Sequence, residues 1–420
     1  SWCRVGTALR PRPDHGHARL ACQQMNSTAK PALPPVHAAA RLLESGGEFF
    51  PALIGAIDHA EREVLLETYI YADDASGRAV TEALLRAAGR GVRVVALIDG
   101  FGASGHIGML GERLRAGGVW LRLYRPLSRF AHFTPSRLRR LHRKIVTIDA
   151  TVSFVGGINI HDDHNLATPG LAGRHDYAVA VSGPVVAALR HAQRRLMGRA
   201  LRRRVPPAPD TPSARARRDL ITRLGLEAVE RMALVLRDNL RHRHAIEHAY
   251  LEALDRAERE VWIANAYFVP GRRVLSALGA AVARGVRVRL ILQGHPEYWF
   301  AREAERALYD VLLDRGIEII EYRASFLHAK VAVVDDRWAT VGSSNLDPFS
   351  LLLAHEANVV IEDSAFASRL RARLAAACEG AGERIDPAQW KRRPAWQRLR
   401  SRLVYGLARL AMRATGFVRY

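Results

Sequence analysis

The chain has 420 residues, 49% of them hydrophobic, which is enough for two domains that each bury a core. Its 63 lysines and arginines against 42 aspartates and glutamates give a net charge of +21, so the favoured partners are polyanions: nucleic acid, an anionic membrane or a phosphorylated substrate. Three cysteines without metal-ligand spacing indicate neither a disulfide framework nor a zinc site and fit an intracellular setting, and no uncharged apolar run is long enough to span a membrane.

The first elements in chain order alternate between helix and strand. Residues 1–40 are predicted to form a disordered leader, within which Met25 is a candidate start of the polypeptide. A strand is expected at 64–70, a helix at 79–89 and another strand at 92–99. A helix is expected ahead of the first strand, from the spacing of Leu53, Ile54, Ile57 and Ala60. This alternation predicts an α/β fold with helices covering a sheet.

The stretch "LHRKIVTIDATVSFVGGIN" at 141–159 carries the first polar motif. His142 and Lys144 are two residues apart at the start of a predicted strand, so their side chains are expected on one face. Histidine can act as a nucleophile or a general acid/base near neutral pH, and lysine supplies positive charge for phosphate oxygens. Glycines followed by asparagine let backbone and amide donors approach an anion. The remaining motif residues are Asp149, Gly156, Gly157 and Asn159.

Two further segments lie between this motif and the second half of the chain. "HDDHN" at 161–165 resembles a metal site, but it has no counterpart later in the sequence, which disfavours that interpretation. Residues 190–218 carry ten arginines and the prolines of "VPPAPDTP". We interpret 206–235 as a linker; a patch facing polyphosphate is the alternative.

The second half repeats the first. "RAEREVWIANAYFVPG" at 256–271 matches "HAEREVLLETYIYADD" at 59–74, and "LHAKVAVVDDRWATVGSSN" at 327–345 matches the first motif. Ordered landmarks at similar offsets indicate an internal duplication. Because the polar residues keep their spacing, we expect chemistry: a metal-independent covalent route needs one histidine to attack and another to protonate the leaving group. The second set is His328, Lys330, Asp335, Gly342, Ser343 and Asn345.

The C-terminal segment 386–420 is basic and amphipathic. Its apolar residues recur at steps of three, four or seven, as on one face of a helix, with arginines beside or opposite them. We expect this helix to lie on an anionic membrane surface; packing on the protein's own core is the alternative. The apolar residues are Trp396, Leu399, Leu403, Leu407, Leu410 and Phe417.

The doubled pattern HxKxxxxD followed by GGxN or GSxN resembles the phospholipase D superfamily over residues 45–365, and stretches such as "HDYAVAVSGPVV" resemble its bacterial cardiolipin synthases. The resemblance implies two tandem pseudo-symmetric domains at 41–205 and 236–385, each a mixed sheet flanked by helices. It also implies transfer of a phosphatidyl group between two phosphatidylglycerol molecules without cofactor or metal. A monomer would then act as an internal pseudo-dimer, peripherally bound to the bacterial inner membrane.

The same resemblance implies roles for individual residues. His142 would be the nucleophile and His328 the acid/base partner, or the reverse, while the motif lysines, glycines and asparagines and Ser343 would hold the phosphate. Asp149 and Asp335 would fix the geometry and charge of the site. The superfamily also has a carboxylate that orients each histidine, and the matching positions here are Asp176 and Glu356.

Two rival functions share much of this pattern. A phosphodiesterase that hydrolyses phospholipid or nucleic acid would have the same fold, and the positive charge suits nucleic acid, although no nucleic-acid partner is expected. A catalytically silent scaffold that binds phosphoinositide or nucleic acid is disfavoured, because both motifs are intact.

Overall fold

The structure is a computed structural model that describes residues 38–105, 107–126, 139–166, 170–201, 212–238, 242–295, 299–347 and 354–414. They belong to a unit that begins at Val36. The predicted leader 1–40 lies outside the described residues except for its last three, and Ala39 and Ala40 already form part of a strand. The described chain contains two similar α/β halves, each built around a mixed sheet.

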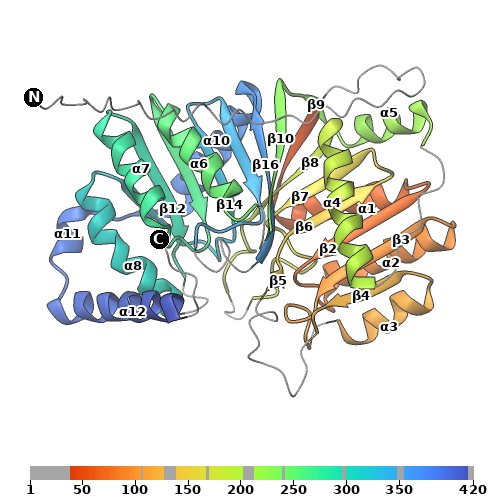
Figure 1. The fold of residues 1–420 in the computed structure, drawn as a ribbon, viewed down its shortest axis with the longest axis horizontal. Coiled ribbons are helices and arrows are strands. Elements are labelled where there is room, and N and C mark those ends of the chain that lie inside the picture. The colour runs from red at the N-terminus through yellow and green to blue at the C-terminus, as the bar shows by residue number, and fades with distance from the viewer. Residues whose placement is uncertain are drawn as a thin grey trace, which may run out of the picture. The chain divides into compact units, whose positions relative to one another are not determined.

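The first half follows the predicted alternation of strand and helix (Figure 1). Strand β2 is buried along its whole length, which is expected for a strand covered by helices on both faces. Helix α2 begins four residues before the predicted 79, because the Asp74 side chain accepts a hydrogen bond from the Gly77 N–H and caps the helix. The elements are β1 (Ala39–Glu44), α1 (Ser45–Asp58), β2 (Glu63–Thr68), α2 (Ala75–Gly89), β3 (Arg93–Asp99), α3 (Gly108–Ala116), β4 (Trp120–Tyr124), β5 (Arg140–Leu141), β6 (Lys144–Ile148), β7 (Val152–Gly156), β8 (Tyr177–Ser182), α4 (Pro184–Leu201), α5 (Ala214–Arg223) and β9 (Glu227–Ala228).

The first sheet has the strand order β4-β3-β2-β6-β7-β8-β1-β9. Strands β2, β3 and β4 are parallel, whereas β6, β7, β8 and β1 join by antiparallel pairs. Parallel neighbours bring the carboxyl ends of β2 and β3 to one edge, and the antiparallel β6 starts at that same edge. This edge is where the first motif histidine lies.

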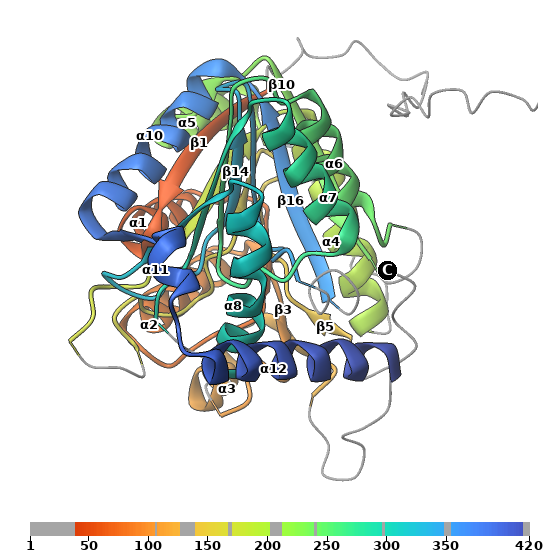
Figure 2. The same cartoon turned by 90° about the vertical axis from the view of Figure 1, so that its left-hand side faces the viewer.

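The second half repeats this plan. Its sheet has the order β10-β16-β15-β14-β11-β12-β13-β17, and Figure 2 shows α10 on one side of it and α6 and α7 on the other. The elements are β10 (Arg231–Arg237), α6 (Ala245–Arg256), β11 (Glu260–Asn265), α7 (Arg272–Ala283), β12 (Arg287–Gln293), α8 (Trp299–Asp314), β13 (Glu318–Tyr322), β14 (Lys330–Val334), β15 (Trp338–Gly342), β16 (Ala354–Glu362), α10 (Ser364–Ala381), β17 (Gly382–Arg384), α11 (Pro387–Lys391) and α12 (Ala395–Ala414).

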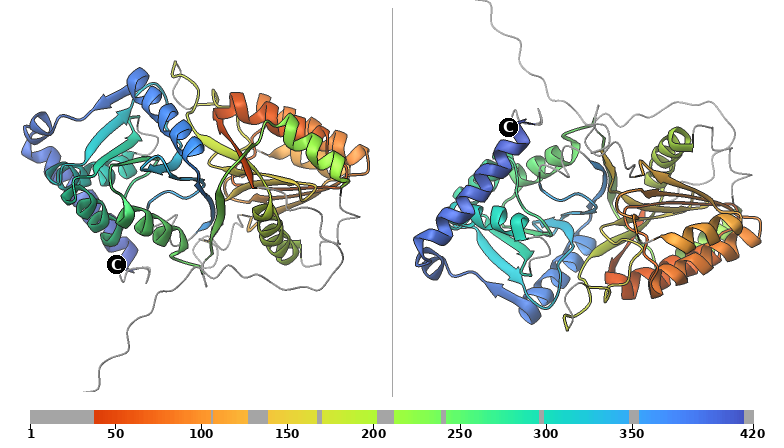
Figure 3. Two further views of the ribbon diagram at one scale, coloured as in Figure 1. Left: turned by 90° about the horizontal axis from the view of Figure 1, so that it is seen from above. Right: turned by 90° about the horizontal axis from the view of Figure 1, so that it is seen from below.

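A hydrophobic core joins the two halves. It contains valines from both sheets, among them Val155 and Val179 of the first and Val341 and Val359 of the second, all at most 1% exposed. Figure 3 shows the two sheets side by side with their helices on the outer faces. The expected α/β class with two mixed, helix-flanked sheets is confirmed.

The interval 206–235, interpreted from the sequence as a linker, is structured where the chain is described. It contains α5, β9 and most of β10. Strand β9 pairs with β1 of the first sheet, and β10 pairs with β16 of the second over seven residues. This part of the chain therefore completes both sheets, and its arginine content masked the short strands that follow.

Candidate active site

The main chain at His142 is held by the second half. His142 follows strand β5, which pairs with β16 in parallel. The N–H groups of His142 and Arg143 both donate to the carbonyl oxygen of His355, at 3.1 and 2.9 Å. The first histidine is therefore fixed by backbone bonds that its own half does not supply.

His328 has the reciprocal arrangement. Its N–H donates to the carbonyl oxygen of His175 at 2.7 Å, and the N–H of His175 donates to Phe326 at 3.0 Å. Gln293, at the end of β12, holds the neighbouring Leu327: its side chain accepts from the Leu327 N–H at 3.1 Å and donates to the Leu327 carbonyl at 3.2 Å. Each histidine thus sits where a segment of one half pairs with the other half.

The carboxylates that contact the two histidines are exchanged between the halves. Glu356 Oε1 lies 2.9 Å from His142 Nδ1, and Asp176 Oδ2 lies 2.6 Å from His328 Nδ1. Both carboxylates are buried. When Nδ1–H donates to a carboxylate, the lone pair of the neutral ring is at Nε2, which can attack an electrophile or accept a proton. Each histidine–carboxylate pair therefore needs both halves.

Both motif lysines lie beside the histidines. Lys144 Nζ donates to the His142 carbonyl oxygen at 2.7 Å. Lys330 Nζ lies 2.9 Å from His328 Nδ1 and also donates to the carbonyl oxygen of His328. Lys144 belongs to β6, whereas His142 precedes that strand.

Burial controls the protonation of these groups. Burial lowers the pKa of His142, and burial together with Lys330 holds the pKa of His328 well below its usual range. Burial also lowers the pKa of Lys144 to about 7 and raises the pKa of Asp176 to about 7. A low histidine pKa favours the neutral imidazole, which is the nucleophilic form.

The motif aspartates, which the resemblance implies fix the geometry and charge of the site, lie away from the histidines. Asp149 follows β6 at the end opposite Lys144, roughly 16 Å along the strand. Its carboxylate accepts three backbone N–H bonds of 2.8 Å from residues 61–63, and Asp335 accepts three from residues 258–260 at 2.6 to 2.8 Å. Both have a φ of 53°, a left-handed conformation that aspartate tolerates. Asp149, in the β6–β7 hairpin, thus binds the turn before β2, and Asp335, in the β14–β15 hairpin, binds the turn before β11.

Ser343 was expected to hold phosphate, but its hydroxyl is already used. It donates to Glu356 Oε2 and accepts from the Ala357 N–H at 3.1 Å. The equivalent Gly157 has no side chain because a Cβ there would lie 2.3 Å from Asp176 Oδ1. These two positions support the exchanged carboxylates.

The other predicted phosphate ligands lie near the same strand edge. Gly156 pairs with Lys144 across β6 and β7, and a Cβ on it would lie 2.5 Å from the Ala178 backbone. Gly342 ends β15 and pairs with Asn358. Asn159 accepts from the Ile70 N–H at 3.1 Å, whereas the buried Oδ1 of Asn345 has no hydrogen-bond partner within the described residues. The asparagine amides and the lysines remain the candidates for binding phosphate oxygens.

The residues of "HDDHN" make hydrogen bonds to nearby parts of the protein. Asp163 accepts from the Gly46 N–H at 2.5 Å, Asp162 accepts from the His164 N–H at 2.9 Å, and His161 Nδ1 lies 2.9 Å from Arg174. Across the described ranges, no three histidine, cysteine, aspartate or glutamate side chains gather in a manner suited to a metal ion.

Tyr69 belongs to this site although no motif contains it. Its ring packs edge-on against His142 with 5.0 Å between ring centroids, and Lys144 Nζ lies 5.4 Å from the ring centre. The repeated stretches carried no signal for it: at the offset of 197 residues between the two copies, Tyr69 corresponds to Ala266, so this tyrosine does not recur in the second half.

Comparison with known proteins agrees with this geometry. The family model described as "Cardiolipin synthase, PLD-like domain" matches residues 53–193 and 250–377. Cardiolipin synthase B of Shigella flexneri and that of Escherichia coli K12 are each 41% identical over 372 residues, covering 88% of this chain and 87% of theirs. Cardiolipin synthase A of Pseudomonas syringae is 33% identical over 80% of this chain and 67% of its own.

A solved structure agrees at the level of the fold. The phosphatidylserine synthase of Haemophilus influenzae superposes with a TM-score of 0.65 at 14% identity, covering 91% of this chain and 97% of its own. The duplicated halves, the matched family model and the identity to curated relatives lead to one conclusion: the chain belongs to the family of cardiolipin synthases with phospholipase D-like domains.

Proposed function

We propose that the protein is a cardiolipin synthase. It transfers the phosphatidyl group of one phosphatidylglycerol to the terminal hydroxyl of a second, which releases glycerol. The observation that carries this proposal is the exchanged pairing of His142 with Glu356 and of His328 with Asp176, supported by the relatives named above. A transfer through a covalent intermediate needs two oriented histidines, and this geometry supplies both.

In the first step, Nε2 of one histidine attacks the phosphorus of the donor lipid. The bond from phosphorus to the glycerol headgroup breaks, and the other histidine, which enters this step as the imidazolium, donates its Nε2 proton to the departing oxygen. In the second step, that histidine takes the proton of the acceptor hydroxyl, whose oxygen attacks the phosphohistidine. The phosphorus–nitrogen bond breaks and cardiolipin leaves.

The surrounding residues have defined parts in both steps. Lys144 and Lys330 stabilise the negative charge that develops on the phosphoryl oxygens, and the amides of Asn159 and Asn345 donate to them. The buried carboxylates orient the rings and stabilise an imidazolium when one forms. The route uses no cofactor or metal, because a histidine is the nucleophile and lysines supply the positive charge.

We infer that one chain suffices and that it works at a membrane surface. Both histidine–carboxylate pairs come from one polypeptide. No helix in the described part of the chain is long and apolar enough to cross a bilayer. Peripheral attachment to the bacterial inner membrane, where phosphatidylglycerol is in reach, fits these features.

The test is to incubate the purified protein with radiolabelled phosphatidylglycerol, with and without a chelator. Cardiolipin and glycerol in equal amounts, unaffected by chelation, are the expected products. Phosphatidic acid as the main product would show that water is the acceptor, and cleavage of single-stranded DNA instead of lipid would support the nuclease alternative. Turnover quenched with a denaturant at neutral to mildly alkaline pH, where a phosphorus–nitrogen bond survives, should leave a phosphatidyl adduct on one histidine, and the labelled peptide identifies which.

A further inference from the structure

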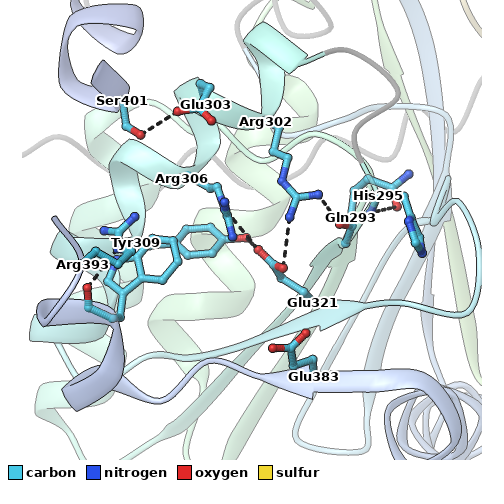
Figure 4. Close-up of polar contacts among 12 residues, drawn as sticks. Gln293, His295, Arg302, Glu303, Arg306, Tyr309, Glu321, Glu383, Arg393 and Ser401 are labelled. Carbon is cyan, nitrogen blue, oxygen red and sulfur yellow. Dashed lines mark hydrogen bonds and ion pairs between the residues drawn. The ribbon is translucent and has the colours of Figure 1, made fainter. Parts of the chain in front are cut away.

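Helix α12 packs on α8 through polar side chains. Arg400 Nη2 lies 2.6 Å from Glu303 Oε1, and the Ser401 hydroxyl donates to Glu303 Oε2 at 2.8 Å. Ser401 is 4% exposed, and Figure 4 shows it facing Glu303. Just before the helix, Trp390 Nε1 donates to Asp310 of α8 at 2.8 Å. These contacts fix which side of α12 faces the protein.

The apolar stripe of α12 faces away from the protein. Trp396, Leu399 and Leu403 are 60%, 58% and 58% exposed, and their spacing of three and four residues places them on one side. Ser401, by contrast, is buried against Glu303, so the side of the helix that carries these apolar residues is not the side that packs on α8. Large apolar side chains gathered on a surface mark a site that binds a partner or a membrane.

The first half contributes two more exposed apolar side chains. Phe101 is 52% exposed in the turn after β3, and Met109 is 77% exposed at the start of α3. Figures 1 and 2 both show α3 and α12 along the same lower side of the described structure. Phe101 is also tied to the active site, because Asp99 accepts from the N–H groups of both Phe101 and Leu141, each at 2.8 Å. Leu141 directly precedes His142.

Helix α12 is connected to the segment of the other histidine by a similar series of contacts. Arg302 directly precedes Glu303 in α8. Its side chain donates to the Gly294 carbonyl and lies 3.3 Å from Glu321 (Figure 4). Gly294 follows Gln293, whose side chain holds Leu327 next to His328. Each group of exposed apolar residues is therefore connected through a series of contacts to the segment that holds one of the two histidines.

We propose that Phe101 and Met109 of the first half and Trp396, Leu399 and Leu403 of α12 form a two-part docking surface for an anionic lipid bilayer. This inference rests on the proposed lipid function and adds how the enzyme meets its substrate. The charge is complementary: α12 contains five arginines and no acidic residue, and the Arg140 guanidinium lies 5.9 Å from the Phe101 ring centre. With contacts on both halves, the bilayer faces the active-site edge and lipid enters without leaving the membrane.

The first experiment measures binding to sucrose-loaded vesicles of phosphatidylglycerol and phosphatidylcholine by sedimentation. His142→Ala is the background throughout, so binding is read without turnover. A variant with Trp396→Ser, Leu399→Ser and Leu403→Ser, and a second with Phe101→Ser and Met109→Ser, should each lower the partition coefficient by about tenfold or more. Val311→Ser removes an exposed apolar side chain of α8 outside the surface, and this matched control should bind as its parent does.

The second experiment reads contact directly and does not depend on multiple substitutions. An environment-sensitive fluorophore is attached at Met109→Cys or at Leu403→Cys after the native cysteines are replaced by serine. Its emission should shift to the blue at both positions with phosphatidylglycerol vesicles, and not at Val311→Cys. A shift at Leu403 alone would overturn the two-part surface. Equal binding to pure phosphatidylcholine, or no shift at either position, would overturn the anionic bilayer as the partner and leave a protein partner as the explanation of the exposed stripe.

Discussion

At the scale of single residues, the two copies of the motif are alike in their histidines and lysines and unlike in what supports them. Glu356, which contacts His142, is held by the Ser343 hydroxyl. Asp176, which contacts His328, lies against Gly157, where a side chain would not fit. The sequence analysis named all four as site residues, Ser343 and Gly157 from the repeated motif and Asp176 and Glu356 from the resemblance to the phospholipase D superfamily. It could not predict that Ser343 donates to Glu356 and not to substrate, since that depends on which half each carboxylate reaches.

Ser343→Ala should therefore impair chemistry more than substrate binding. Loss of a hydrogen bond to a buried carboxylate lets Glu356 move from His142, and we expect kcat to fall about 10- to 100-fold with KM for phosphatidylglycerol little changed. Ser344→Ala is the matched control, because the Ser344 hydroxyl donates to the Asn345 carbonyl and does not contact Glu356. A rise in KM with unchanged kcat would instead support the phosphate-binding role.

Asp176 should make stability depend on pH. Because its pKa is raised to about 7, the folded chain keeps a proton on this group between about pH 4 and 7 that the unfolded chain loses. The contribution of Asp176 to the free energy of unfolding falls as pH rises across this window, by up to roughly 4 kcal/mol, while the lowered pKa of His328 contributes in the opposite direction. Asparagine does not titrate, so the Asp176→Asn variant lacks this loss. Chemical denaturation should show its free energy of unfolding rising relative to that of the wild type from pH 4 to 7, with a constant difference above pH 7. A difference that does not vary with pH would contradict this account.

At the scale of elements, the sequence predicted α1, β2, α2 and β3, because apolar runs and helical spacing are local signals, and these four are found close to their expected positions. No prediction covered β1, α3 or β4. The structured part of 206–235 was missed, because β9 has two residues and β10 is an edge strand whose partner β16 lies over 100 residues away. The motif aspartates show the same limit: their repeated spacing indicated chemistry, yet they serve a hairpin in each half.

Asp149→Ala should accordingly destabilise the fold and spare the reaction. Three backbone N–H groups lose their acceptor, which we expect to cost about 1–3 kcal/mol and to lower the melting temperature. The kcat of the folded fraction should stay near that of the wild type. His142→Ala should give the opposite pattern, with a normal melting temperature and no turnover. An Asp149→Ala protein that melts normally but is inactive would return this residue to the catalytic centre.

At the scale of the whole molecule, the duplication predicted that the two motifs serve one site, and the fold class was predicted with it. The exchange of carboxylates could not be predicted, because sequence does not say which half's strand edge faces which histidine. That exchange, within one chain, leads to a further expectation about mixtures of variants.

Mixing the His142→Ala chain with the His328→Ala chain should not restore activity. Each chain contains only one intact histidine–carboxylate pair, and the missing pair cannot be supplied from a second chain whose halves are already joined through the shared core. Assays across a range of protein concentrations, alongside each variant alone, measure this. Recovery of turnover that increases with concentration would show that halves are shared between chains.

The backbone bonds between the halves also matter while the chain is being made. His142 depends on the carbonyl of His355 and the carboxylate of Glu356, which the ribosome adds more than 200 residues later. Until those residues have emerged and folded, the nascent first half holds a histidine with neither its backbone anchor nor its carboxylate. A chain that ends before these residues therefore lacks an oriented His142, and we expect it to be inactive toward membrane lipids.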